Sequence, residues 1–230
     1  MTARQTSSTR EKTEMKRLVI FDLDGTLLDT VADLASATNY ALRECGFPVH
    51  DGAAYYNFVG RGINMLFRNA LPESERTDEN IARMRSFFLP YYNIHNTDES
   101  RPYEGIPQLL HILSERGVAL AVASNKYQQA TEKLIRHFFP DICFSLVLGQ
   151  REGFPLKPDP AIVNVIREQT ATEREATLYV GDSGIDMLTA AHAGVESVGV
   201  TWGFRPVSEL TDNGACHLAD TPDEILSYIP

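Results

Sequence analysis

Short apolar runs recur along this chain and stand out against longer stretches of mixed polar and apolar residues. Five of them predict strands, at residues 18–21, 118–123, 144–148, 178–180 and 197–200. Each run is apolar almost continuously rather than at every second position. This pattern is typical of strands that are covered on both faces, as in a parallel sheet.

Helical patterns lie between the predicted strands. In residues 105–116 the apolar side chains recur at helical spacing on one face, and Gly117 follows as a C-terminal stop. Residues 184–194 repeat the pattern and end at Gly194. This alternation of strands and helices predicts an α/β fold with a doubly wound, Rossmann-like parallel sheet.

Residues 31–97 break the alternation, because they contain no clear strand. They predict helices at 31–45, at about 61–71 and at about 78–94, and we expect Pro90 to kink or interrupt the last of these. A helical block directly after the first strand indicates a small second domain. The expected domains are a disordered tail at 1–15, an α/β core at 16–28 plus 98–230, and an all-helical insertion at 29–97.

Composition narrows the possible partners. The chain has 230 residues, 43% of them hydrophobic, and a formal net charge of −10. Such a surface repels phosphate backbones, so we expect no nucleic-acid partner. No apolar run approaches the roughly 20 residues of a membrane-spanning helix, and residues 1–15 do not form a secretory signal. Three scattered cysteines without a CxxC motif fit a reducing compartment, so we expect a cytoplasmic protein with no membrane partner.

Two carboxylates follow the first predicted strand. Asp22 and Asp24 come directly after the apolar run LVIF. Like charges about 4 Å apart repel each other by a few kcal/mol at an intermediate dielectric, so something must offset this repulsion. One acid could stay protonated, a divalent cation could bridge the pair, or both could be solvated in an ordinary Asp-Gly turn.

A second acidic segment favours the cation. The sequence YVGDSGID places Asp182 after another apolar run and Asp186 one helical turn later. The carboxyl ends of parallel strands meet at one edge of the sheet, where such folds bind ligands. Asp22, Asp182 and a main-chain carbonyl near Asp24 would supply hard oxygen ligands, which suit Mg²⁺. No histidine occurs beside these segments, which argues against zinc.

Two further segments carry groups that can bind an anion. Ser124 and Asn125 end the strand AVASNKY, where a hydroxyl and free N–H groups at the start of the next helix form an anion site. Lys157 lies in the proline-stiffened loop FPLKPDP. Ser124 could instead be an ordinary helix cap, and Lys157 a solvated surface lysine. Together, however, these segments supply what phosphoryl transfer requires.

Four motifs in this order resemble those of the haloacid dehalogenase-like hydrolase superfamily. They are DLDGT at 22–26, the serine of SNK at 124–126, Lys157 of LKPDP, and GDSGID at 181–186. The resemblance spans about residue 16 to the end, and the helical insertion resembles the family's helical cap. Within the superfamily, FVGRGINMLFRNAL, GDSGIDMLTAAHAGV and GVTWGF most resemble phosphoglycolate phosphatases.

The resemblance implies roles for the catalytic residues. Asp22 would be the nucleophile that forms an aspartyl-phosphate. Asp24 would protonate the leaving alkoxide and then activate water. Lys157 would neutralise the nucleophile and the intermediate. Asp182 would bind Mg²⁺, and Asp186 would be a further ligand or orient the first ones.

The resemblance also implies binding roles. Ser124 and Asn125 would hold the transferring phosphoryl group, and Thr26 would hold the phosphate or fix the loop. Arg61, between two glycines, is a candidate for a carboxylate or distal group of the substrate, although it could be a surface arginine. Lys126, next to the phosphate anchor, is a similar candidate.

The leading hypothesis is therefore a Mg²⁺-dependent phosphatase for a small phosphorylated metabolite, with 2-phosphoglycolate as the best single candidate. A sugar-phosphate mutase on the same scaffold stays open, as does the oligomeric state. Asp24 argues against a dehalogenase. The absence of lysine from residues 31–97 excludes a phosphonate hydrolase that uses a Schiff base. A non-catalytic protein with this fold would be expected to lack one of four residues, but all four are present in this chain: Asp22, Asp24, Lys157 and Asp182.

Overall fold

A parallel sheet forms the centre of the molecule. The structure is a computed structural model that describes residues 15–229, so the predicted tail at 1–15 lies outside the described residues except for Met15. The strands are β1 (Leu18–Phe21), β4 (Ala119–Tyr127), β5 (Leu146–Gln150), β6 (Thr177–Gly181), β7 (Glu196–Val200) and β8 (His217–Ala219). They are all parallel, in the order β5-β4-β1-β6-β7-β8, which confirms the predicted α/β fold.

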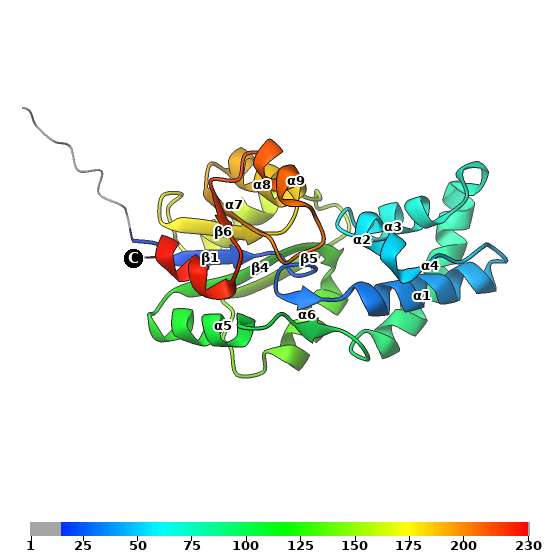
Figure 1. The fold of residues 1–230 in the computed structure, drawn as a ribbon, viewed down its shortest axis with the longest axis horizontal. Helices are drawn as coiled ribbons and strands as arrows, with labels where there is room; N and C mark the ends of the chain where they lie inside the picture. The colour runs from blue at the N-terminus through cyan, green and yellow to red at the C-terminus, as the bar shows by residue number, and fades with distance from the viewer. Residues whose placement is uncertain (1–14, 230) are drawn as a thin grey trace, which may run out of the picture.

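Helices cover both faces of the sheet. They are α5 (Ile106–Glu115), α6 (Gln128–Phe138), α7 (Ala161–Gln169), α8 (Gly184–Ala193), α9 (Val207–Asp212) and the 3-10 helix η3 (Pro222–Tyr228). Figure 1 shows α7, α8 and α9 above the sheet and α5 and α6 below it.

Successive residues of β1 explain why the strand is apolar at every position. Val19 and Phe21 pack in the cluster that contains residues of α5 and α6, whereas Leu18 and Ile20 pack with residues of α7 and α8. All four side chains are fully buried. Burial of each such side chain contributes about 1.5–3 kcal/mol, so the central strand is firmly anchored on both sides.

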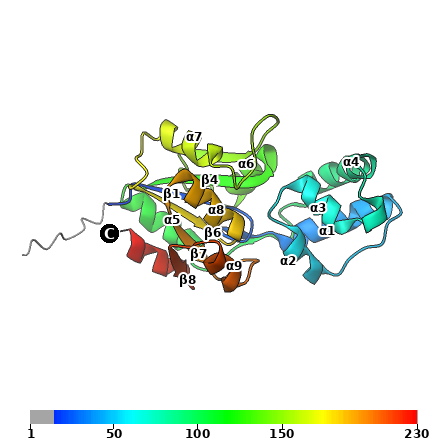
Figure 2. The same ribbon diagram turned by 90° about the horizontal axis from the view of Figure 1, so that it is seen from above.

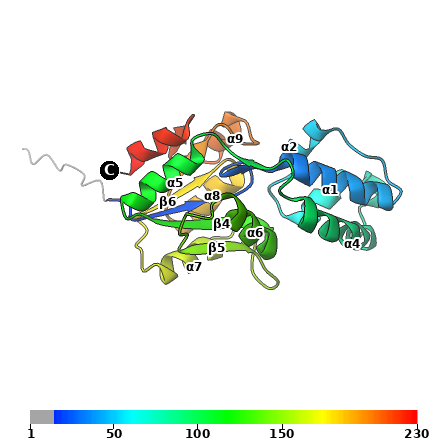
Figure 3. The same cartoon turned by 90° about the horizontal axis from the view of Figure 1, so that it is seen from below.

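The helical segment lies beyond one end of the sheet. It contains η1 (Gly52–Ala54), α1 (Val31–Glu44), α2 (Tyr55–Phe58), α3 (Ile63–Ala70), η2 (Glu73–Glu75) and α4 (Asp78–His95). Figures 2 and 3 show this group of helices beside the core. Its helices enclose a separate hydrophobic cluster that includes Leu42, Phe67 and Met84.

Two short strands connect the helical segment to the core. β2 (Leu28–Asp29) and β3 (Arg101–Pro102) pair antiparallel where the chain leaves the core and returns to it. The predicted insertion boundaries, 29 and 97, fall at β2 and just before β3. Strands of two residues are too short to give a sequence pattern, which is why the sequence did not predict them.

Pro90 does not interrupt α4, so the expected interruption was wrong, and a kink at Pro90 stays a prediction. The helix continues from Asp78 to His95 with Pro90 inside it. Pro90 is exposed, while Phe88 and Tyr92 on the opposite face are buried. Proline costs about 3 kcal/mol in a helix interior, and burial of the apolar face offsets this cost. Within residues 15–229, no helix is both long enough and apolar enough to cross a membrane.

Candidate active site

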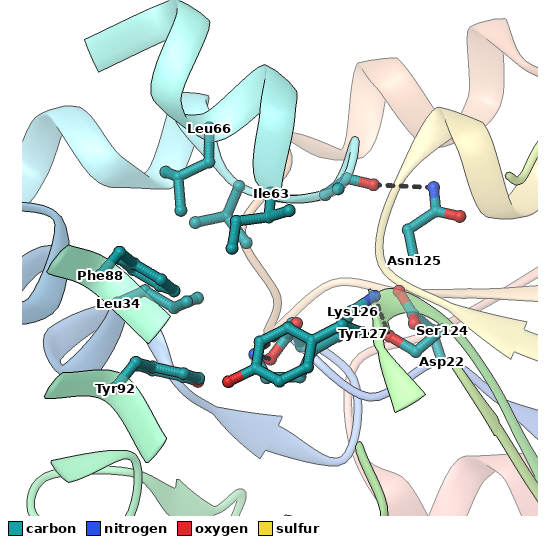
Figure 4. A pocket seen from close by; sticks show the side chains of 14 residues that line it. Asp22, Leu34, Ile63, Leu66, Phe88, Tyr92, Ser124, Asn125, Lys126 and Tyr127 are labelled. Carbon is teal, nitrogen blue, oxygen red and sulfur yellow. Dashed lines mark hydrogen bonds and ion pairs between the residues drawn. The ribbon is translucent and has the colours of Figure 1, made fainter. Parts of the chain in front are cut away.

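The site forms where β1, β4 and β6 end. Asp22 directly follows β1, Ser124 lies in the last part of β4, and Asp182 directly follows β6. Since β1 pairs with both other strands in parallel, these residues emerge at the same edge of the sheet. A pocket opens here between the core and the helical segment (Figure 4). Its core side is lined by Asp22, Asp24, Ser124, Asn125, Lys126 and Tyr127.

Asp22 is held by two donors. The main-chain N–H of Leu23 donates to Asp22 Oδ1 at 2.7 Å, and Lys157 Nζ lies 2.9 Å from the same oxygen. Burial and the negative charge of Asp186 raise the pKa of Asp22 to about 7, although Lys157 acts in the opposite direction. Asp22 therefore has a fixed orientation but lacks full charge compensation.

Lys157 is enclosed by oxygen atoms. Its Nζ donates to Asp186 Oδ1 at 2.7 Å, to the Ala123 carbonyl at 2.9 Å and to Tyr179 Oη at 3.1 Å. Burial alone would lower the pKa of Lys157, but the charges of Asp186 and Asp22 raise it well above its ordinary value. The lysine is thus a fixed positive charge beside Asp22 and not the solvated side chain of the alternative interpretation.

Asn125 attaches the Lys157 loop to β4. The Lys157 N–H donates to Asn125 Oδ1 at 2.8 Å, and Asn125 Nδ2 donates to the Lys157 carbonyl at 3.2 Å. The same Nδ2 lies 3.2 Å from the Gly60 carbonyl in the helical segment, as Figure 4 shows. Asn125 therefore acts here as a bridge between three parts of the chain.

An acidic cluster lies behind the nucleophile candidate. One oxygen each from Asp22, Asp182 and Asp186 lie within 4.8 Å of one another, and all three residues are buried. Thr26 Oγ1 donates to Asp182 at 3.2 Å, and the Phe204 N–H donates to Asp182 at 2.8 Å. Burial, followed by the charges of Asp186 and Asp22, still raises the pKa of Asp182 well above its ordinary value.

The charge balance of this cluster fits a divalent cation. When ionised, Asp22, Asp24, Asp182 and Asp186 face two ammonium groups, which leaves two negative charges uncompensated. Hard carboxylate oxygens are the donors that Mg²⁺ prefers.

Glycines allow the backbone to approach Asp182 closely. A Cβ on Gly25 would lie 2.3 Å from Asp182 Oδ2, and one on Gly203 would lie 2.2 Å from Asp182 Cβ. Real Cβ atoms essentially never approach other atoms this closely. The residues around Asp182 are therefore fitted to hold its carboxylate in one place.

Asp186 is fully occupied by protein contacts. Its Oδ1 accepts from Lys157 and, at 3.1 Å, from Tyr179 Oη. Its Oδ2 accepts from the Ser183 N–H at 3.1 Å and from Ser183 Oγ at 2.6 Å, which also caps α8. These contacts favour an orienting role over direct ligation, the two roles that the sequence left open.

The Asp24 side chain takes a different position from the cluster. Lys126 Nζ contacts its two oxygens at 2.8 and 3.0 Å, and Thr30 Oγ1 donates to Asp24 Oδ1 at 2.6 Å. Asp24 and Asp22 both line the pocket. The two carboxylates thus face one space with different partners.

The remaining predicted binding residues differ in placement. Ser124 is buried, lines the pocket and accepts from the Lys126 N–H at 3.2 Å. Thr26 is fully buried and contacts Asp182, so it fixes the loop rather than reaching the pocket. Arg61 is exposed and does not line the pocket, although Gly60 and Gly62 beside it do. Its predicted substrate contact stays a prediction.

Sequence reasoning missed several residues of this site. Tyr179 contacts Lys157, Thr30 contacts Asp24, and Tyr92 lines the pocket. Arg205 donates to the main-chain carbonyls of Tyr56 and of Val59, the latter at 2.7 Å, and so joins the core to the helical segment. Tyr179 lies within an ordinary strand pattern and Tyr92 within a helix, so the sequence gives no local signal for either role.

Comparison with known proteins identifies the family. The model of the haloacid dehalogenase-like hydrolase family matches residues 19–200. A phosphoglycolate phosphatase of Vibrio vulnificus strain YJ016 is 34% identical over 220 residues, which cover 93% of this chain and 96% of that protein. One of Vibrio cholerae is 36% identical over 200 residues, covering 82% and 86% of the two chains.

A solved structure extends this similarity to the fold. The structure of a predicted phosphoglycolate phosphatase from Haemophilus somnus has a TM-score of 0.85 and 28% identity, covering 92% of this chain and 97% of that one. The similarity in sequence and in fold extends over nearly the whole chain. The chain belongs to the haloacid dehalogenase-like hydrolase family.

Proposed function

We propose that this protein is a Mg²⁺-dependent phosphomonoester hydrolase that acts through an aspartyl-phosphate, with 2-phosphoglycolate as its preferred substrate. One observation carries the proposal. Asp22, paired with Lys157 at 2.9 Å and clustered with Asp182 and Asp186, opens onto a pocket that Asp24 also lines.

In the first step, an Asp22 carboxylate oxygen attacks the phosphorus of the ester. The bond between phosphorus and the ester oxygen breaks, and Asp24 gives its proton to the departing alkoxide. Lys157 offsets the negative charge of Asp22, so that this carboxylate can approach an anionic phosphoryl group. Ser124, near the end of β4, would hold that group. The Asn125 side chain is already bonded to the Lys157 and Gly60 backbones, so it would support the phosphate site by fixing the Lys157 loop.

In the second step, water attacks the phosphorus of the aspartyl-phosphate. Asp24, now a carboxylate, takes a proton from this water, and the bond between phosphorus and the Asp22 oxygen breaks. Inorganic phosphate leaves, and both carboxyl groups return to their starting states. The ion pair with Lys126 and the hydrogen bond from Thr30 keep Asp24 in position for both proton transfers.

Asp22, Asp182 and the main-chain carbonyl of Asp24 would hold Mg²⁺, with Asp186 orienting Lys157 beside them. The ion would offset the negative carboxylate charge that the two lysines leave uncompensated. It would also lower the repulsion between carboxylate and phosphate. Thr26 and the Phe204 N–H keep Asp182 directed toward this place.

The helical segment, predicted at 29–97, would act as a cap that selects the substrate. The curated relatives are phosphoglycolate phosphatases, which supports 2-phosphoglycolate as the substrate. The cap wall of the pocket is mainly apolar and offers a hexose phosphate few hydrogen-bond partners. This favours hydrolysis of a small ester over the sugar-phosphate mutase that the sequence left open.

Hydrolysis of 4-nitrophenyl phosphate with Mg²⁺ or with EDTA tests this proposal. We expect turnover only with Mg²⁺, and a loss of at least about a thousandfold in kcat for Asp22→Asn, because the nucleophile is removed. Asp141→Asn is the matched control, since this aspartate is exposed on the surface. Full activity of Asp22→Asn, or equal turnover in EDTA, would refute the proposal.

A further inference from the structure

The two sides of the pocket differ in chemistry. The core side carries the carboxylates, Ser124 and Lys126, whereas the helical segment contributes Leu34, Val59, Ile63, Leu66 and Phe88. Figure 4 shows Leu34, Ile63, Leu66 and Phe88 around the space opposite Asp22. The cavity volume is about 40 Å³. Since a single water needs roughly 10–15 Å³ by the same measure, the space suits a small substrate.

Tyr92 is the exception on the apolar side. Its side chain is fully buried, and its Oη has no hydrogen-bond partner among residues 15–229. The ring stacks on Phe88 at a centroid distance of 5.1 Å, which fixes its direction. Burial raises the pKa of Tyr92 well above its ordinary value, so the hydroxyl keeps its proton at neutral pH. A buried hydroxyl without an acceptor is costly, and here it lines a substrate-sized space.

Lys126 lies over the ring of Tyr92. Its Nζ is 5.1 Å from the centroid of the Tyr92 ring, and Figure 4 shows Tyr92 projecting from α4 toward it. Among the described residues that line the pocket, Lys126 is the only one with a positive charge. An ammonium group has three N–H donors, and the contacts to the two Asp24 oxygens leave one for a ligand.

The donors that remain match a carboxylate. One N–H of Lys126 and the O–H of Tyr92 are both without an acceptor among the described residues. A carboxylate has two oxygens, so one can accept from Lys126 and the other from the Tyr92 hydroxyl.

We propose that Tyr92 Oη and Lys126 Nζ together bind a single carboxylate at the far end of the substrate. The substrate class is then a small phosphomonoester whose organic part ends in a carboxylate. Polyhydroxylated esters are rejected, because their hydroxyls would face the apolar wall without partners. This inference rests on the proposed function and assigns to Tyr92 and Lys126 the recognition that the sequence had suggested for Arg61.

The test compares two esters that differ only at the far end. Tyr92→Phe removes one oxygen, and kcat/KM is measured for 2-phosphoglycolate and for ethyl phosphate. We expect kcat/KM for 2-phosphoglycolate to fall about tenfold, mostly through KM, and that for ethyl phosphate to stay unchanged. Tyr55→Phe is the control, because Tyr55 is also buried in the helical segment but donates to Asn39 Oδ1 outside the pocket.

A binding measurement separates recognition from turnover. In the Asp22→Asn background, calorimetry with 2-phosphoglycolate should show about tenfold weaker binding once Tyr92→Phe is added. The role of Tyr92 would be overturned if Tyr92→Phe lowered kcat/KM equally for both esters. It would also be overturned if the variant changed neither the ratio of the two kcat/KM values nor the affinity for 2-phosphoglycolate. If the wild type hydrolyses neither ester nor 4-nitrophenyl phosphate, the proposed function fails, and this inference fails with it.

Discussion

Asp22 and Asp182 each follow a fully buried strand, and each is held by donors from elsewhere in the chain. The sequence could predict their meeting, because residues at the carboxyl ends of parallel strands share one edge of the sheet. It could not predict that Thr26 and the Phe204 N–H orient Asp182. Those contacts depend on loop conformations that leave no periodic pattern.

Tyr92 shows the same limit more clearly. Its spacing from Phe88 is that of an ordinary apolar helix face, and no local pattern distinguishes it from a packing residue. Its hydroxyl acquires a role because α4 packs beside the end of β4, where Lys126 lies. Arg61 stood out in the sequence as an arginine between two glycines. Its side chain is exposed, and the pocket is lined by Gly60 and Gly62 instead.

Gly203 provides a residue-scale prediction. A Cβ there would lie 2.2 Å from Asp182 Cβ and 2.5 Å from the Gly25 carbonyl, so Gly203→Ala must displace Asp182. We expect a loss of roughly 1–3 kcal/mol in the free energy of unfolding, as in overpacked cores. The Mg²⁺ concentration for half-maximal activity should rise by about 10–100-fold, as when other supports of metal ligands are lost.

Urea denaturation and a Mg²⁺ titration of activity measure these two effects. Gly52→Ala is the control, because a Cβ on Gly52 would meet no atom within 4 Å. A Gly203→Ala variant with wild-type stability and Mg²⁺ response would show that this close packing does not hold Asp182.

At the scale of elements, predictability followed length and pattern. β1 was predicted at its observed bounds, and α5 and α8 to within a residue at either end. β8, with three residues, and the two-residue strands β2 and β3 were missed. Such short strands depend on pairing with distant segments, and their residues alone do not specify them. The interruption expected at Pro90 was wrong for the opposite reason, because tertiary packing of α4 overcame a strong local preference.

Pro90 therefore yields a stability prediction. Pro90→Ala restores the N–H that an interior helical residue donates to the carbonyl four positions earlier, and it removes the clash of the ring. Since Pro90 is exposed, no cavity forms. We expect the free energy of unfolding to rise by about 1–3 kcal/mol, with kcat for 4-nitrophenyl phosphate unchanged.

Denaturation in urea gives the result directly. Pro72→Ala is the comparison, because Pro72 precedes a 3-10 helix rather than interrupting an α-helix. It should give no comparable gain. An equal or lower stability of Pro90→Ala would mean that α4 is already adapted to the missing hydrogen bond.

At the scale of the whole molecule, an acidic chain proposed to handle an anionic substrate concentrates positive charge where it is needed. The formal net charge is −10, yet Lys126 and Lys157 are both buried at one edge of the sheet. Each is already paired with a carboxylate, so the phosphoryl group needs a further cation. Contacts from Arg205 and Asn125 join the helical segment to this edge of the core.

The central claim is that Asp22 carries the phosphoryl group during turnover, and covalent trapping tests it most directly. Asp24→Asn should still transfer phosphoryl from 4-nitrophenyl phosphate, whose leaving group needs no acid, but should not activate water. Mixing this variant with ³²P-labelled 4-nitrophenyl phosphate and Mg²⁺, followed by acid quenching, should give one label per chain on the peptide that contains Asp22. A burst of nitrophenol without protein-bound label, or label on another residue, would contradict the account.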